Sequence, residues 1–99
     1  MVLEVAVLDV ISGREVEFEA AFRRAQAIMS SMHGYRSHEL HRCIETTTRY
    51  ILLVRWDKLE DHTVGFRGSP GYQEWKRQLH HFYDPFPVVE HFTLVHGVP

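Results

Sequence analysis

The chain has 99 residues, of which 24% are charged and 44% are hydrophobic. This size and balance predict one compact soluble domain over residues 1–99 and leave no room for a second. The net charge of −2 argues against nucleic acid as a partner, because binding to phosphates requires a concentrated basic face.

The first apolar segment, residues 2–10, is typical of a β-strand. It contains two acids, lacks the basic lead of a signal peptide and is too short to cross a bilayer, so we expect no membrane partner. Cys43 is the only cysteine. It excludes an internal disulfide and fits a reducing compartment, so we expect a cytoplasmic protein.

A helix is predicted over residues 14–32, where apolar residues recur at helical spacing. Ser12 and Glu15 form a capping-box pattern at its start, and Gly34 can supply the left-handed turn that ends many helices. Residues 35–44 mix polar and apolar side chains, as an exposed edge strand does.

The second half of the chain continues with a strand over residues 50–56, which is apolar on both alternating faces. Such a strand is typically central and covered on both sides. A short helix over residues 57–66 ends at the Gly-Ser-Pro sequence of residues 68–70. A second helix over residues 71–82 and a last strand over residues 88–95 complete the predicted elements.

This order of elements predicts a ferredoxin-like α+β fold, βαββαβ, with an antiparallel sheet. Its first and third strands lie in the middle, and these are the two strands with apolar residues on both faces.

Because the helices cover only one face, roughly 500 Å² of apolar surface would stay open, and burying it is worth on the order of 12 kcal/mol before association costs. We therefore expect a homodimer whose sheets pack face to face. The alternatives are a monomer with a bare sheet and a complex with a different partner.

Three segments, residues 56–62, 65–75 and 87–92, resemble the antibiotic biosynthesis monooxygenase domain family. The most specific features are the tryptophan that ends the third strand, the short acidic helix and the Ser-Pro before the last helix. The resemblance implies a dimeric α/β barrel, in which two ferredoxin-like subunits pack their sheets together. The family includes oxygenases that act on phenolic polyketides without metal or flavin, enzymes that degrade haem and proteins with no assigned substrate, so it indicates fold better than function.

For the cofactor-free oxygenases, the resemblance implies a pocket between sheet and helices that is lined by Trp56. His62 stands at the position of a family tyrosine on the short helix, and Lys76 lies near that of a basic residue on the last helix. Leu52 replaces an asparagine of those enzymes, which is a departure from the family pattern.

For the haem degraders, the resemblance implies an asparagine, a tryptophan and an axial histidine. Ala6, Gly65 and Lys76 stand roughly at those three positions. His80 lies one turn further along the helix, so haem ligation there would require a shifted pocket.

The residues themselves suggest how a cofactor-free oxygenase would work, since its substrate must lose a phenolic or enolic proton before the anion can pass an electron to dioxygen. His62 is the predicted base, because histidine titrates near neutral pH, and Lys76 or Arg67 is predicted to stabilise the anion. Aromatic rings would supply flat apolar walls. The predicted substrate-binding residues are Trp56, Phe66, Arg67, Tyr72, Trp75 and His91.

Each of these residues also has an ordinary structural interpretation. His62 can be a hydrogen-bonded structural histidine, the aromatic residues can belong to the core or an interface, and Lys76 can lie on a solvated helix face. Neither close pair among the eight histidines has the spacing of a chelate. A metal site built from distant residues such as His62 and His91 stays open, but we expect none.

The leading interpretation is therefore a cofactor-independent monooxygenase that acts on a small aromatic or quinol-like compound. The first alternative, from a different class, is a non-catalytic dimeric module that binds or senses a metabolite. The second is a haem-degrading monooxygenase.

Overall fold

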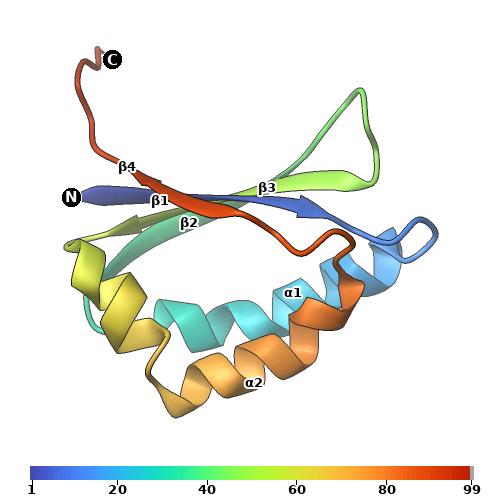
Figure 1. Ribbon diagram of the computed structural model, residues 1–99, viewed down its shortest axis with the longest axis horizontal. Coiled ribbons are helices and arrows are strands. Elements are labelled where there is room, and N and C mark those ends of the chain that lie inside the picture. Colours follow the sequence, from blue (N-terminus) through green and yellow to red (C-terminus); the bar gives the residue numbers. More distant parts are fainter. Residues whose placement is uncertain (99) are drawn as a thin grey trace.

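The computed structural model describes residues 1–98 and has the predicted order of elements, with a four-stranded antiparallel sheet on one side and two helices on the other (Figure 1). The strands lie in the order β2-β3-β1-β4, so the first and third strands are central. This confirms the ferredoxin-like α+β fold. The elements are β1 (Val2–Asp9), α1 (Glu15–Ser30), β2 (Tyr35–Arg42), β3 (Arg49–Trp56), α2 (Pro70–Leu79) and β4 (Val89–Phe92).

The core fills the layer between the sheet and the helices. Alternate residues of β1 and β3 point into this layer, as the two-residue repeat of a strand requires. They meet the apolar face of α1, where Phe18 is fully buried and its ring lies 4.9 Å from that of Tyr50 and 5.8 Å from that of Phe82. The hydrophobic periodicity of the sequence therefore places the core correctly.

The short helix predicted over residues 57–66 is mainly a π-helix, η1 (Asp61–Phe66). Its hydrogen bonds span five residues instead of four, a geometry that is rare and occurs often at functional sites. The second predicted helix consists of two segments in the structure. The α-helix α2 ends at Leu79, and a 3₁₀ turn, η2 (His80–Phe82), follows it directly.

Two predicted details differ from the structure. Arg14, not Ser12, precedes the first helical residue and no side chain caps that helix; instead, the backbone N–H of Gly13 donates to the carboxylate of Glu15. The last strand ends at Phe92, because its final pairing is with Leu3 near the start of β1 and little of that strand remains to pair with the following residues.

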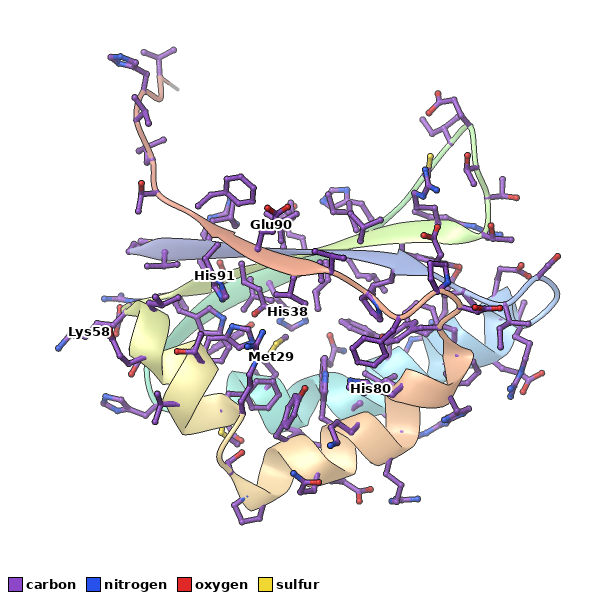
Figure 2. The ribbon with its side chains drawn as sticks, in the orientation of Figure 1. Met29, His38, Lys58, His80, Glu90 and His91 are labelled. Atoms are coloured by element: carbon purple, nitrogen blue, oxygen red, sulfur yellow. The ribbon has the colours of Figure 1, made fainter. Side chains whose placement is uncertain are left out.

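The face of the sheet opposite the helices is uncovered in the single chain (Figure 1). Val5 and Leu53 are paired near its centre, and Val7 and Phe92 on the same face are 41% and 49% exposed. Figure 2 shows the two faces on β4, where Glu90 points to the open side and the next residue, His91, points into the layer between sheet and helices. In the described part of the chain, no helix is long and apolar enough to cross a membrane.

Candidate functional site

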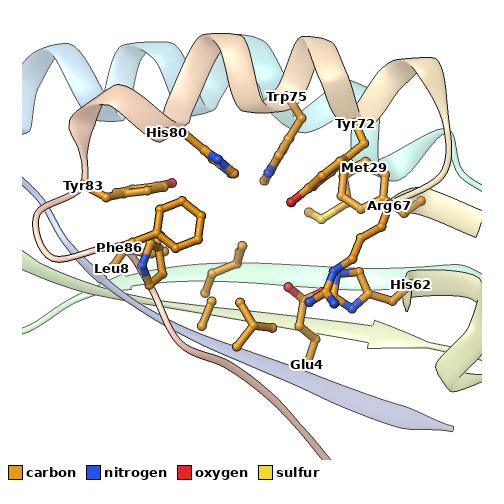
Figure 3. Close-up of a pocket in the computed structure, with 15 residues that line it drawn as sticks. Glu4, Leu8, Met29, His62, Arg67, Tyr72, Trp75, His80, Tyr83 and Phe86 are labelled. Carbon is orange, nitrogen blue, oxygen red and sulfur yellow. The ribbon is translucent and has the colours of Figure 1, made fainter. Parts of the chain in front are cut away.

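A cavity of about 350 Å³ lies between the sheet and α2 (Figure 3). Its floor includes the cross-strand row Leu52, Ala6 and Val89, in which the small Ala6 side chain leaves room above the sheet. Tyr72 and Trp75 project into it from α2. The cavity therefore has an aliphatic floor and an aromatic roof.

The π-helix η1 brings three of the predicted site residues to one end of this cavity. The backbone N–H of Arg67 donates to the carbonyl of His62 at 3.1 Å, a hydrogen bond that spans five residues. This wide turn lets His62, Phe66 and Arg67 all line the same cavity. The ring of Phe66 packs edge-on against those of Tyr72 and Trp75, with centroids 5.2 and 5.7 Å away.

A buried carboxylate, that of Glu4, lies at the same end of the cavity and is only 5% exposed. The indole Nε1–H of Trp56 donates to its Oε1 at 2.9 Å. Burial raises the pKa of Glu4 above its ordinary value, although the Trp56 hydrogen bond and the positive charge of Arg67 both act in the opposite direction. The carboxyl group of Glu4 thus has a raised pKa, and it lies on the same face of β1 as the apolar residues Ala6 and Leu8.

His62 is enclosed by neighbours, with 3% of its surface exposed. Its ring stacks on that of Trp56 at 5.4 Å, its Nδ1 shares a 2.7 Å hydrogen bond with Nε2 of His91, and its Nε2 lies 3.4 Å from Oε1 of Glu4. Burial, the charge of Arg67 and the neighbouring His91 lower the pKa of His62 to about 3. The imidazole is therefore neutral at physiological pH, and its contact with Glu4 is not an ion pair there.

Five of the predicted site residues meet at the cavity: His62, Phe66, Arg67, Tyr72 and Trp75. The other three are not among the residues that line it, and their contact with a ligand stays a prediction. Trp56 is fully buried behind Glu4, and His91 lies behind His62. The ammonium of Lys76 lies 5.6 Å from the centre of the Tyr72 ring.

Sequence reasoning missed three lining residues that carry polar groups: Glu4, His80 and Tyr83. His80, which the sequence analysis considered only as a haem ligand, points from the turn after α2 toward the sheet and lines the cavity (Figure 2). A signal for Glu4 was present, because an acid at that position shares its face with buried Ala6 and Leu8. The turn that carries Tyr83 gave no comparable signal.

The arrangement of His62 and His91 does not resemble a metal site. Their nitrogens face each other across a hydrogen bond, whereas metal ligands converge on a common point. Over residues 1–98, no cluster of three histidine, cysteine or acidic side chains has a geometry that could hold a metal ion.

Comparisons with known proteins agree with this architecture. The chain is 60% identical to the uncharacterized protein YczJ of Bacillus subtilis (strain 168) over 95 residues, which are 96% of this chain and all of that one. A crystal structure of a Bordetella bronchiseptica protein named for antibiotic biosynthesis monooxygenases is 35% identical, with a TM-score of 0.91 over 95% of this chain and 96% of that one. SnoaB, a cofactor-independent oxygenase from Streptomyces nogalater, shares the fold at 24% identity, with a TM-score of 0.80 over 99% and 96% of the two chains. The sequence model of the antibiotic biosynthesis monooxygenase family matches residues 1–78, and the chain therefore belongs to that family.

Proposed function

We propose that this protein is a monooxygenase that acts, without metal or flavin, on a small aromatic compound with a weakly acidic hydroxyl or C–H group. The observation that carries the proposal is the cavity itself, which joins aromatic walls to one polar end formed by Glu4, His62 and Arg67. Family membership adds support, and so does the shared fold with a cofactor-independent oxygenase.

The size of the cavity favours a compact ligand. A cavity of about 150 Å³ holds benzene, and typical ligand sites span roughly 300–1,000 Å³. At about 350 Å³, the present cavity fits a ligand of two or three fused rings. Phe66 and Trp75 would contact its faces, since both rings border the cavity.

The proposed chemistry begins with loss of a proton from the bound substrate, which leaves an electron-rich anion that can reduce dioxygen. The Arg67 guanidinium, at the same end of the cavity as Glu4, would stabilise that anion. One oxygen atom then enters the substrate as a carbonyl and the other leaves as water. The two hydrogens lost by the substrate balance the water, so no external reductant is required.

We also propose that the active form is a homodimer in the cytoplasm. The open face of the sheet supports this assembly, because paired strands there present Val5, Leu53 and the partly exposed Val7 and Phe92. Packing two such faces together would remove this apolar surface from water.

The proposal is tested by oxygen uptake with a panel of anthrone-, naphthol- and quinol-type compounds. Ala6→Leu fills the floor of the cavity, whereas Ala27→Leu adds the same side chain to the exposed side of α1. We expect uptake by the wild type and by Ala27→Leu, and at least a tenfold loss in Ala6→Leu. Thermal melting checks that Ala6→Leu is folded, since overpacking can cost about 1–3 kcal/mol.

Two results would contradict the proposal. Uptake no faster than buffer across the panel, with quenching of tryptophan fluorescence by the same compounds, would favour the non-catalytic binding module. A Soret band on adding haemin, followed by loss of pigment with a reductant, would favour haem degradation.

A further inference from the structure

The fold does not require a negatively charged side chain at the position of Glu4. The Trp56 indole needs an acceptor for its Nε1–H, but the amide oxygen of a glutamine would serve as well. Glu4 lies in a cross-strand row between Val54 and His91, on the same face of the sheet as apolar Ala6 and Leu8. Carboxylates are seldom buried without a matching charge, so an acid retained at the end of a cavity calls for a chemical explanation.

The two oxygens of Glu4 have different surroundings. Oε1 accepts the Trp56 N–H at 2.9 Å and faces Nε2 of His62 at 3.4 Å. No hydrogen bond within residues 1–98 reaches Oε2, yet that part of the chain holds no fully enclosed side-chain oxygen without a partner. Because Glu4 lines the cavity, Oε2 is the oxygen that a bound molecule can approach.

His62, the base predicted from the sequence, is less suited to accept a proton. Its Nδ1 is engaged with His91, and its Nε2 faces Glu4. The environment lowers the pKa of His62 to about 3, whereas burial raises the pKa of Glu4. Burial thus disfavours a proton on His62 and favours a proton on the carboxylate of Glu4.

We infer that Glu4 is the catalytic base of the proposed oxygenase, taking a proton from an acidic hydroxyl or C–H group of the aromatic substrate. This inference rests on the proposed function and names the substrate class more closely: compounds that can form a phenolate or enolate. The substrate O–H or C–H bond breaks, its electron pair stays on the substrate and the proton binds Oε2 of Glu4. Negative charge thus moves from Glu4 to the substrate while the Arg67 guanidinium remains at the same end of the cavity.

His62 is a positioning residue in this scheme. When His91 donates its Nε2–H to Nδ1 of His62, the remaining proton of His62 is on Nε2 and points toward Oε1 of Glu4. Stacking on Trp56 holds the imidazole in place. Together these contacts orient the carboxylate and leave its second oxygen free for the substrate.

Other titratable groups also face the cavity or lie next to it. Burial lowers the pKa of His80 in η2 and of His91 on β4, with smaller contributions from the charges of Lys76 and Arg67 respectively. Burial also raises the pKa of Tyr83, so that phenol stays neutral. The hydroxyl of Tyr72 and the guanidinium of Arg67 complete the groups that face the cavity.

The decisive experiment measures proton transfer separately from oxygen chemistry. Anthrone, whose CH₂ protons exchange through its enolate, is incubated with the protein in D₂O without oxygen, and deuterium incorporation is followed by mass spectrometry. Wild type and the surface control Glu17→Gln should accelerate exchange equally. Glu4→Gln should lose about a hundredfold or more, the usual contribution of a general base, and Glu4→Asp should retain part of the rate.

The pH profile separates a chemical role from a structural one. The wild-type exchange rate should fall as the pH drops through the raised pKa of Glu4, and this acid limb should disappear in Glu4→Gln. His62→Gln should shift the limb without abolishing exchange. Loss of exchange in His62→Gln with unchanged exchange in Glu4→Gln would overturn the inference and assign the proton to His62.

Failure of the inference and failure of the proposed function give different results. Exchange that depends on Glu4 without oxygen uptake would support the base and remove the oxygenase. Oxygen uptake that is unchanged in Glu4→Gln would keep the oxygenase and remove the base. Exchange no faster than in buffer for the wild type would overturn the inference directly.

Discussion

Replacing Glu4 by glutamine should make the protein more stable at slightly alkaline pH. The amide keeps an oxygen that can accept the Trp56 N–H, so the buried hydrogen bond is preserved while the negative charge is removed. The pKa of Glu4 is raised on balance, which means that the cost of burying its charge exceeds the help it receives from Trp56 and Arg67. The ionised carboxylate therefore destabilises the folded state.

The sign and size of the effect follow from proton linkage. Because the folded pKa lies above the unfolded one, the folded state binds the proton more tightly, and this stabilisation is complete only below the unfolded pKa, near 4.5. It is lost as the pH rises through the folded pKa. Wild type and Glu4→Gln should thus be similar in stability at pH 4, and the gap in favour of the variant should grow to about 1.4 kcal/mol for each unit of difference between the two pKa values.

Urea unfolding at pH 4 to 8, at one fixed chain concentration, measures this gap. Trp56 and Trp75 are both buried, so their fluorescence reports unfolding directly. Other groups titrate alike in both proteins and cancel in the difference. A wild type that gains stability over Glu4→Gln as the pH rises would refute the reasoning, because it would mean that the charged form is the one that the fold favours.

Three further substitutions test the fold and the assembly. Leu53→Glu puts a charge on the open face and should give an 11.7 kDa monomer in sedimentation at micromolar concentration. The control Val16→Glu, at a site 83% exposed on α1, should remain a dimer. A dimeric Leu53→Glu would exclude this face as the interface. Ser69→Ala removes the side chain that accepts the Tyr72 N–H at the start of α2 and should cost about 1 kcal/mol in urea unfolding. Phe18→Ala empties a fully enclosed ring site and should cost about 3–5 kcal/mol; a loss under 1 kcal/mol would show that neighbouring rings collapse into the space.

The fold was predictable because strand and helix periodicities are local properties of the sequence. Residues 50–56 are apolar on both alternating faces, which identified β3 as central, and the sheet order confirms it. The same alternation could have identified Glu4, because the acid shares a face with Ala6 and Leu8. Attention to the polar residue on an apolar face, and not only to the apolar ones, would have located the carboxylate.

The rest of the site depends on distances that a linear pattern does not contain. Trp56 was expected to line the pocket, but its indole turns to Glu4 and leaves the cavity wall to other rings. The contact between His62 and His91 joins residues 29 positions apart. It requires both the pairing of β4 with β1 and the wide turn of η1, and neither the register nor a π-helix can be read from local spacing.

Strand β1 presents two different surfaces on alternate residues. Glu4, Ala6 and Leu8 border the cavity, while Leu3, Val5 and Val7 lie on the open face. In the proposed homodimer, substitutions at even-numbered positions should change which molecules enter the cavity without altering the contact between subunits, and substitutions at odd-numbered positions should do the reverse. A combinatorial library that varies only the even-numbered or only the odd-numbered positions of β1 would therefore alter the cavity and the proposed subunit interface separately.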